Sequence, residues 1–328
     1  MRAVRVRAFE GSGRLAVVDD APRPEAGDGV VIDVRSAGIS FPDLLLSRGR
    51  YQVQPEPPFT LGVEAAGVVA AVPEGSALRV GERVAAFAFG AFAEQVVAPE
   101  QTVMRLPDAL SFDEGAGLIM NYQTAYLGLA VRGDLRQGEE VLVHGASGGV
   151  GTAAIQVAKG LGAHVTGVVS SVAKAEVARR AGADEVIVSR SATDWRAGAV
   201  GVTSRGAFDL IYDPVGGQER TDESVRALRP GGRLVVIGFA DGQIPTLALN
   251  RVLLRNISIV GAAWGHYLAD DMSLAGRIAT SLTELVAAGA VRPLVGATYA
   301  LRDAERALDD LEQRRATGKL VLRVEEAA

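Results

Sequence analysis

Residues 141 to 151 read VLVHGASGGVG, a run of buried-strand residues that breaks into glycines and then continues as a helical pattern. The three glycines, Gly145, Gly148 and Gly151, have the spacing G-x-x-G-x-x-G. The first lets the chain turn sharply off the strand, the second lets backbone N–H groups approach a pyrophosphate, and the third lets the helix pack close to the sheet. The following helix would point the positive end of its dipole at the bound anion. Because a strand precedes the motif and a helix follows it, we expect a dinucleotide site here rather than an ordinary tight turn. The predicted cradle consists of Gly145, Ala146, Ser147, Gly148, Gly149 and Val150.

From about residue 139 onward, short apolar stretches alternate with helical patterns. This alternation is typical of an α/β fold with a parallel, doubly wound sheet. The expected strands are 140–144, 164–169, 185–188, 208–213, 233–238 and 257–261, and the expected helices are 149–161, 172–181 and 218–228.

The first 119 residues differ, because short β-branched stretches alternate there with Gly and Pro turns. They predict a mostly β domain, with strands at 30–34, 67–72, 83–87 and 93–97. From about 262 the sequence predicts one or two amphipathic helices (275–288 and 301–317) and a last strand (319–324). This tail is too short to form a domain, so we expect it to pack on the N-terminal one. The predicted division is therefore 1–119 with 262–328 as one domain and 120–261 as a nucleotide-binding domain, with the active site in the cleft between them.

Composition narrows the function further. The chain has 328 residues and 48% hydrophobic content, which is enough for two cores. A net charge of -5 disfavours nucleic acid as a main partner. No apolar run approaches the roughly 18 to 20 residues that span a bilayer, so we expect a cytoplasmic protein without a membrane partner. With no cysteine, and with three histidines that are not spaced as a ligand pair, we expect no metal site.

The end of the second strand of the nucleotide-binding region, HVTGVVSS, indicates which dinucleotide binds. An acidic residue there would accept a hydrogen bond from the ribose 2′-OH of NAD, but the strand ends in Ser170 and Ser171, with Lys174 following. Two hydroxyls and an ammonium suit a 2′-phosphate, which favours NADPH over NADH. Arg190 is a weaker candidate for the same phosphate. In the alternative interpretation, the serines only cap the next helix and Lys174 is a solvated surface residue.

Taken together, the motifs resemble the zinc-free quinone oxidoreductase branch of the medium-chain dehydrogenase/reductase superfamily, to which zeta-crystallin belongs. The resemblance covers nearly the whole chain. It implies a GroES-like catalytic domain, a Rossmann cofactor domain and a homodimer joined along the cofactor-domain sheet. The matching segments are AGISFPDLLLSRGRY (37–51), LGVEAAGVV (61–69), VGERV (80–84), NYQTAY (121–126), HGASGGVG (144–151), GGRLVVIGFADG (231–242) and GKLVL (318–322).

Two departures from related families bear on the chemistry. Zinc alcohol dehydrogenases carry a cysteine and a histidine where this chain has Ser40 and Val63, so the resemblance implies no catalytic zinc. Many quinone oxidoreductases have Asn where Ser40 stands and a Tyr near Ser189, so substrate orientation and adenosine binding differ in detail here.

The reaction that remains is direct hydride transfer from the nicotinamide to a quinone or an α,β-unsaturated carbonyl, whose developing charge hydrogen bonds can stabilise. An enoyl-thioester reductase and a non-catalytic NADPH-binding sensor stay open as alternatives, and water could supply the proton. The resemblance places Tyr51 at the substrate carbonyl, although it could be a surface aromatic, and it places Asn121 and Thr124 beside the nicotinamide. The candidate catalytic residues are Tyr51, Ser40, Asn121 and Thr124, and further cofactor contacts are expected from Gly238, Phe239 and Lys319.

Overall fold

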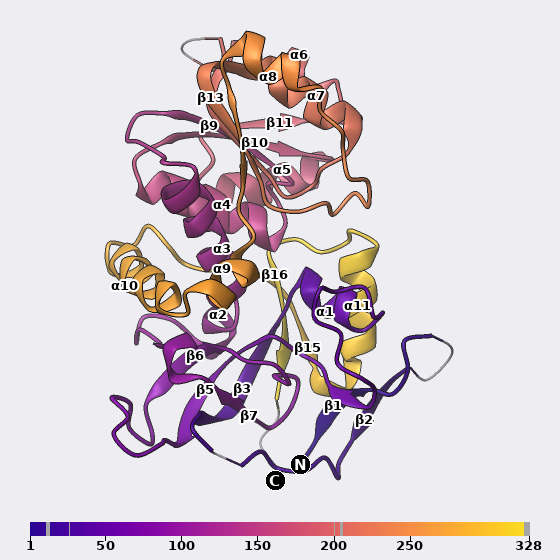
Figure 1. The fold of residues 1–328 in the computed structure, drawn as a ribbon, viewed down its shortest axis with the longest axis vertical. Coiled ribbons are helices and arrows are strands. Elements are labelled where there is room, and N and C mark those ends of the chain that lie inside the picture. The colour runs from indigo at the N-terminus through magenta and orange to yellow at the C-terminus, as the bar shows by residue number, and fades with distance from the viewer. Residues whose placement is uncertain (11–13, 26, 200, 204–205, 325–328) are drawn as a thin grey trace. The chain divides into compact units, whose positions relative to one another are not determined.

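The structure is a computed structural model that describes residues 1–10, 14–25, 27–199, 201–203 and 206–324 (Figure 1). Contacts between Cα atoms divide the chain into two compact units. Unit 1 comprises residues 1–120, 272–279 and 293–328, and unit 2 comprises residues 121–271 and 280–292. The domain boundaries predicted at residues 119 and 262 stay a prediction. Residues 325–328 of the predicted first domain lie outside the described residues.

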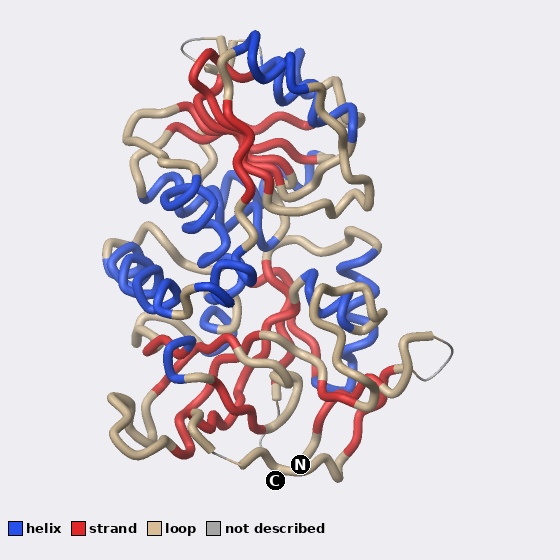
Figure 2. The backbone as a smooth tube through the Cα atoms, viewed as in Figure 1, coloured by secondary structure: helices blue, strands red, loops and turns tan. Residues whose placement is uncertain are grey.

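Unit 1 is rich in β-strands, which are red in Figure 2, and all of their pairings are antiparallel except that of β15 with β16. Within the described ranges, one sheet has the order β15-β16-β3-β5-β6-β8, with β7 also paired to β3, and a smaller sheet has the order β2-β1-β4. The strand near the C-terminus, β16, pairs antiparallel with β3, so that Leu320 lies opposite Ile39. The tail is thus part of the sheet formed by the first hundred residues. The strands are β1 Ala3–Val6, β2 Leu15–Val18, β3 Val30–Ile39, β4 Phe59–Thr60, β5 Glu64–Ala71, β6 Arg83–Phe87, β7 Gln95–Ala98, β8 Val103–Arg105, β15 Val295–Ala300 and β16 Lys319–Arg323.

Short helices connect these strands. Helix α1 (Phe41–Leu46) begins immediately after β3, and Asp43 in its first turn accepts a hydrogen bond from the backbone N–H of Ser40, the N-cap residue. This reciprocal cap satisfies a donor that would otherwise be orphaned at the helix start. The other helical segments are η1 Glu100–Thr102, α2 Phe112–Gly115, η4 Leu301–Asp303 and α11 Ala304–Glu312.

Unit 2 contains a parallel sheet in the order β11-β10-β9-β12-β13-β14 among the described residues. Numbered from β9, this is the order 3-2-1-4-5-6 of a doubly wound dinucleotide fold. Helices lie on both sides of the sheet (Figure 2), and the core on one side is centred on Leu142, Phe208 and Trp195. The predicted Rossmann-like α/β class is confirmed. The strands are β9 Glu140–His144, β10 His164–Val169, β11 Glu185–Val188, β12 Phe208–Asp213, β13 Leu228–Val236 and β14 Ser258–Gly261.

The helices of unit 2 follow the expected alternation. They are α4 Gly149–Gly160, α5 Val172–Arg180, α6 Trp195–Ala199, α7 Gln218–Ala227, α8 Leu249–Arg255 and α9 Trp264–Asp270. Ahead of β9, a stretch with π-helical turns comprises η2 Ile119–Gln123, α3 Thr124–Tyr126 and η3 Leu127–Arg132, and helix α10 (Ser273–Ala287) joins segments of both units. None of the helices in the described ranges has the length and apolar character needed to cross a membrane.

Several elements differ from the sequence predictions. Strand β13 spans 228–236 rather than 233–238, because its pairing with β12 starts at Phe208 opposite Leu228 and ends at Asp213 opposite Val236. The single helix expected over 301–317 is a 3₁₀ turn followed by α11, which ends at Glu312; Arg314 then takes a left-handed conformation with φ of 56°. The elements that were not predicted include strands β1, β2, β4, β8 and β15 and helices α6, α8 and α9.

Candidate functional site

The glycine-rich turn between β9 and α4 has the geometry that the motif predicts. Gly145 has a φ of +60°, so the chain leaves the strand through a conformation that side chains disfavour. At Gly151, an added Cβ would lie 2.2 Å from the Gly145 carbonyl oxygen, so only glycine lets α4 pack this close to the turn. Gly148 is different, because the nearest atom to an added Cβ is 3.6 Å away. The space ahead of the α4 N-terminus is therefore kept open by the lack of a side chain, as an approaching phosphate requires.

The ends of β10 and β11 meet beside this turn. The two strands are parallel with Val169 opposite Val188, and the Ser189 N–H donates to the Val169 carbonyl at 2.8 Å. The segment starting at Ser170 and the loop starting at Ser189 therefore leave the same edge of the sheet side by side. Ser170 is exposed and Lys174 is half-buried. Ser171 accepts a hydrogen bond from the Lys174 backbone N–H at 3.3 Å, so this hydroxyl caps α5, as the alternative interpretation expects.

The loop after β11 is held by Asp194. Its carboxylate accepts hydrogen bonds from the Ser189 hydroxyl and from the backbone N–H groups of Arg190 and Ser191, the latter two at 3.2 Å. These donors, led by Ser189, lower the pKa of Asp194 to about 2. The loop thus has a fixed shape, and the side chain of Arg190 is exposed on it.

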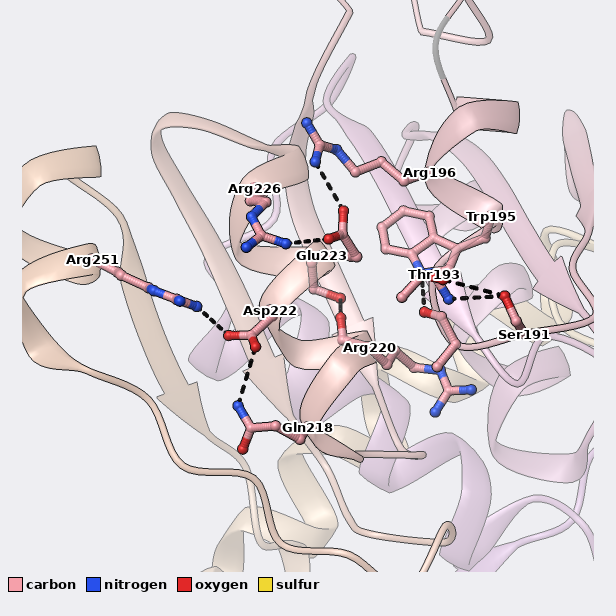
Figure 3. Close-up of polar contacts among 12 residues, drawn as sticks. Ser191, Thr193, Trp195, Arg196, Gln218, Arg220, Asp222, Glu223, Arg226 and Arg251 are labelled. Carbon is pink, nitrogen blue, oxygen red and sulfur yellow. Dashed lines mark hydrogen bonds and ion pairs between the residues drawn. The ribbon is translucent and has the colours of Figure 1, made fainter.

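Ion pairs fix the helices next to this loop (Figure 3). Arg196 of α6 reaches Glu223 of α7 at 2.9 Å, and Glu223 also pairs with Arg226. On the other side of α7, Asp222 pairs with Arg251 of α8. These contacts join α6, α7 and α8, which supports the loop between β11 and α6 from outside.

The predicted nicotinamide-side residues of unit 2 lie in different environments. Asn121 is buried and Thr124 is half-buried. Tyr122 is buried, and its hydroxyl donates to Gln156 of α4 at 2.7 Å. Trp264 is also buried, with its indole N–H 3.2 Å from the Gln123 side-chain oxygen. Hence Tyr122 connects η2 with α4, and Trp264 connects α9 with η2. The roles of Asn121 and Thr124 stay predictions.

Gly238 and Phe239 follow β13 rather than ending it, and both are half-buried. The loop after the neighbouring strand β12 is shaped by Asp213, whose carboxylate accepts the backbone N–H groups of Val215 and Gly216 at 2.8 and 3.0 Å. Val215 in turn approaches the turn at Gly145, where an added Cβ would lie 3.0 Å from its Cγ2. Asp213 was not singled out in the sequence, although a carboxylate that ends an apolar strand is a signal for such a role.

In unit 1, Ser40 belongs to a buried polar cluster with Glu64 and Lys319. The Ser40 hydroxyl donates to Glu64 Oε1 at 2.7 Å, and the Lys319 ammonium donates to Ser40 Oγ at 2.6 Å and also pairs with Glu64. The second Glu64 oxygen accepts the backbone N–H of Met120 at 2.9 Å. Glu64 is fully buried and Lys319 is 3% exposed. The structure thus shows the Lys319 ammonium inside unit 1, and its predicted contact with a cofactor stays a prediction.

Asp43 lies beside this cluster and is fully buried. One of its oxygens, Oδ2, accepts the Ser40 N–H at 2.7 Å, while Oδ1 is buried without a hydrogen-bond partner. Burial raises the pKa of Asp43 to about 8, against the opposing effects of the Ser40 N–H and the Lys319 charge. Tyr51 is half-buried, and its pKa is raised by burial and then by the charge of Asp43. Asp43 and Glu64 were missed in the sequence, although a charged residue inside an apolar segment is itself a signal of a buried partner.

The residues that replace the zinc ligands of related enzymes offer no metal site. Val63 is a buried apolar residue, and the Ser40 hydroxyl accepts a hydrogen bond from the Lys319 ammonium. Within the described ranges, no three His, Cys, Asp or Glu side chains are grouped so that they could hold a metal ion. His144 is fully buried, with its Nε2 3.0 Å from Ser224 Oγ and its ring edge-on to Trp195, and burial lowers its pKa to about 4. These contacts are those of a histidine that packs in the core of unit 2.

Comparison with known proteins gives matches over both parts of the chain. The alcohol dehydrogenase GroES-like domain family matches residues 26–108, and the zinc-binding dehydrogenase family matches residues 149–281. Quinone oxidoreductase-like protein 2 of Mus musculus is 33% identical over 332 residues, which cover 96% of this chain and 94% of the relative.

Solved structures agree in fold over nearly the full length. The quinone oxidoreductase of Thermus thermophilus, whose complex with NADPH is also known, is 34% identical with a TM-score of 0.82, covering 98% of this chain and 100% of that one. A mycobacterial protein complexed with NADPH is 32% identical with a TM-score of 0.87, covering 98% and 99%. Near-complete coverage by such relatives, together with Ser40 and Val63 at the two metal positions, shows that this chain belongs to the zinc-free quinone oxidoreductase branch of the medium-chain dehydrogenase/reductase superfamily.

Proposed function

We propose that this protein is an NADPH-dependent reductase of quinones or α,β-unsaturated carbonyls that works without zinc. The observation that carries the proposal is the open turn at Gly148 ahead of α4, flanked at the same sheet edge by Ser170, Ser171 and Lys174 with no acidic residue ending β10. Relatives with the same fold have been solved with NADPH. The fit is chemical as well as spatial, because hydroxyl and ammonium donors match a 2′-phosphate that a carboxylate would repel.

Within this function, unit 2 would bind and orient the cofactor. The backbone N–H groups at residues 146–150 would hold the pyrophosphate, with the 2′-phosphate at Ser170, Lys174 and Arg190. When bound, NADPH would supply a hydride to an electron-poor carbon of the acceptor. Asn121, Thr124, Gly238, Phe239 and Lys319 remain proposed contacts on the nicotinamide side. The Tyr51 hydroxyl would donate a hydrogen bond to the acceptor oxygen, where negative charge develops. Ser40, whose single hydroxyl proton is donated to Glu64, would act indirectly by holding Glu64 and Lys319 in place.

The cofactor proposal is tested by fluorescence titration with NADPH and NADH. Losing one charge-assisted hydrogen bond of about 1.5 to 3 kcal/mol should weaken NADPH binding about tenfold or more in Lys174→Ala and leave NADH binding unchanged. Lys159→Ala is the matched control, because Lys159 pairs with Asp184 at 2.7 Å near the other end of α4. Equal affinities of the wild type for the two cofactors, or an unchanged NADPH affinity in Lys174→Ala, would disprove the 2′-phosphate site.

The reaction is tested by following NADPH oxidation with 1,4-benzoquinone, 9,10-phenanthrenequinone, a 2-alkenal and an enoyl thioester. We expect turnover with a quinone or the alkenal. Turnover with the thioester alone would identify an enoyl-thioester reductase instead. Tight NADPH binding without turnover of any acceptor would show a sensor rather than an enzyme.

We further propose that the protein is a cytoplasmic homodimer formed along the open edge of the unit 2 sheet. Strand β14 ends that sheet, and an uncovered edge strand readily pairs with another chain. Helix α8, which precedes it, has no buried residue, and Leu249, Leu253 and Leu254 are 73 to 80% exposed. An apolar surface next to a free strand edge suits a second copy related by a two-fold axis.

A further inference from the structure

We propose that Gln156 and Trp264 are positioning residues, which hold the side chain of Asn121 in place to bind the nicotinamide end of the cofactor. The inference rests on the proposed function, because it takes NADPH as the bound dinucleotide. It goes beyond that function by giving a role to two residues whose own polar groups are engaged inside the protein. All of the residues that carry it belong to unit 2.

Asn121 is buried, and yet its side-chain amide is unpaired. The residue is only 5% exposed, and among the described residues no group forms a hydrogen bond with this amide. An unpaired polar side chain in such a position calls for a ligand. A carboxamide offers a donor and an acceptor side by side, so it complements another carboxamide, such as that of nicotinamide.

Tyr122, the next residue of η2, is anchored by Gln156 of α4. The Tyr122 hydroxyl donates to Gln156 Oε1 at 2.7 Å. The same oxygen accepts the backbone N–H of Arg292 at 2.9 Å, and the Gln156 amide nitrogen donates to the Arg292 carbonyl at 2.9 Å. Gln156 is thus held at both ends of its amide and is 6% exposed. Because α4 begins at Gly149, this anchor fixes η2 on the helix whose N-terminus faces the predicted pyrophosphate site.

Gln123, the following residue, is anchored by Trp264 of α9. The Trp264 indole N–H donates to the side-chain oxygen of Gln123 at 3.2 Å, and the two residues are 3% and 1% exposed. The two anchors therefore come from different elements of unit 2. Neighbouring residues of a helix do not face each other, so fixing Tyr122 and Gln123 also fixes the direction in which Asn121 points.

The polar character of the anchors fits a positioning role. A buried hydrogen bond adds little net stability, but a fully paired buried network fixes one geometry. The segment it fixes, η2, is a π-helical turn, a conformation found frequently at functional sites. A binding group contributes its full hydrogen bond only when it is held in the correct orientation before the ligand arrives.

The first test compares the binding of NADPH with that of 2′-phosphoadenosine diphosphate ribose, a fragment that lacks the nicotinamide. Asn121→Ala should weaken NADPH binding about three- to tenfold, the effect of one hydrogen bond, and leave fragment binding unchanged. Gln156→Leu and Trp264→Phe should show the same pattern, because they release Asn121 but not the phosphate-binding residues. Trp195→Phe is the matched control, since its buried indole N–H donates to the Ala192 carbonyl at 2.9 Å. Any loss in this control should be equal for both ligands.

The second test asks whether the anchors act through Asn121. In the Asn121→Ala background, Gln156→Leu or Trp264→Phe should weaken NADPH binding no further, because the group that they hold is gone. Any loss caused by Trp195→Phe should add to that of Asn121→Ala. Tyr122→Phe removes only a hydroxyl, so it replaces Gln156→Leu if that variant fails to fold.

The outcomes separate the inference from the proposed function. Unchanged NADPH binding in the anchor variants, equal weakening of NADPH and the fragment, or losses that add to that of Asn121→Ala would overturn the inference and leave the proposed function standing. A wild type that binds neither NADPH nor the fragment would defeat the proposed function and the inference with it.

Discussion

Removing Lys319 should destabilise the protein far more than removing Lys159, a partly exposed lysine that also forms an ion pair. In Lys319→Met the ammonium is lost, while Glu64 remains fully buried with only the Ser40 hydroxyl and the Met120 N–H as partners. Breaking a buried pair from one side costs about 3 to 5 kcal/mol, because the remaining charge is uncompensated. For a protein of this size this corresponds to a fall in Tm of about 10 °C. Lys159→Met, whose ion pair with Asp184 is about one-third exposed, should cost less than about 1 kcal/mol.

The assay is urea unfolding at pH 7. In Glu64→Gln/Lys319→Met no charge is stranded, and most of the lost stability should return. The reasoning fails if Lys319→Met costs no more than the Lys159 control, or if the double variant is as unstable as the sum of the single ones.

Three further predictions concern other parts of the chain. Gly151→Ala should weaken NADPH binding about tenfold and lower the free energy of unfolding by about 1 to 3 kcal/mol, because the added Cβ would lie 2.2 Å from the Gly145 carbonyl oxygen. Gly276→Ala is the control: an added Cβ has open space there, so this variant should be neutral or slightly stabilising. His144 stays neutral in the folded state down to about pH 4 but takes a proton below about pH 6.5 in the unfolded state. Acidification between these two values therefore lowers the free energy of unfolding of the wild type by up to about 1.4 kcal/mol per pH unit. His144→Gln should flatten this slope in urea unfolding measured from pH 7 to pH 5. Leu253→Glu should convert the proposed dimer to monomer in light scattering coupled to size exclusion; a wild type that is already monomeric would refute the proposed interface.

The features that could be predicted from the sequence depend on residues close together along the chain. The strand, turn and helix around Gly145 to Gly151 are local. Gly145 is required by its positive φ and Gly151 by the nearby Gly145 carbonyl, which is why motif and geometry agree. The alternation that predicted the parallel sheet is also local. In contrast, Ser40 and Lys319 are 279 positions apart and meet because β16 pairs with β3. Spacing along the chain carries no information on such a contact, so the ion pair of Lys319 with Glu64 and its hydrogen bond to Ser40 were not predicted.

The cluster around Ser40 also gives a physical reason why this chain would work without a metal. A divalent cation needs donors that carry excess negative charge and are free to coordinate. Ser40 Oγ and Glu64 Oε1 are instead both engaged by the Lys319 ammonium, which is buried and lies 2.6 Å from the hydroxyl. A cation bound at these two oxygens would have to displace Lys319, or lie next to its charge in a region of low dielectric constant. The ammonium and the Ser40 hydroxyl thus keep the charge of Glu64 balanced within the protein. Under the proposed function, the polarisation of an acceptor carbonyl would then fall to hydrogen-bond donors such as Tyr51.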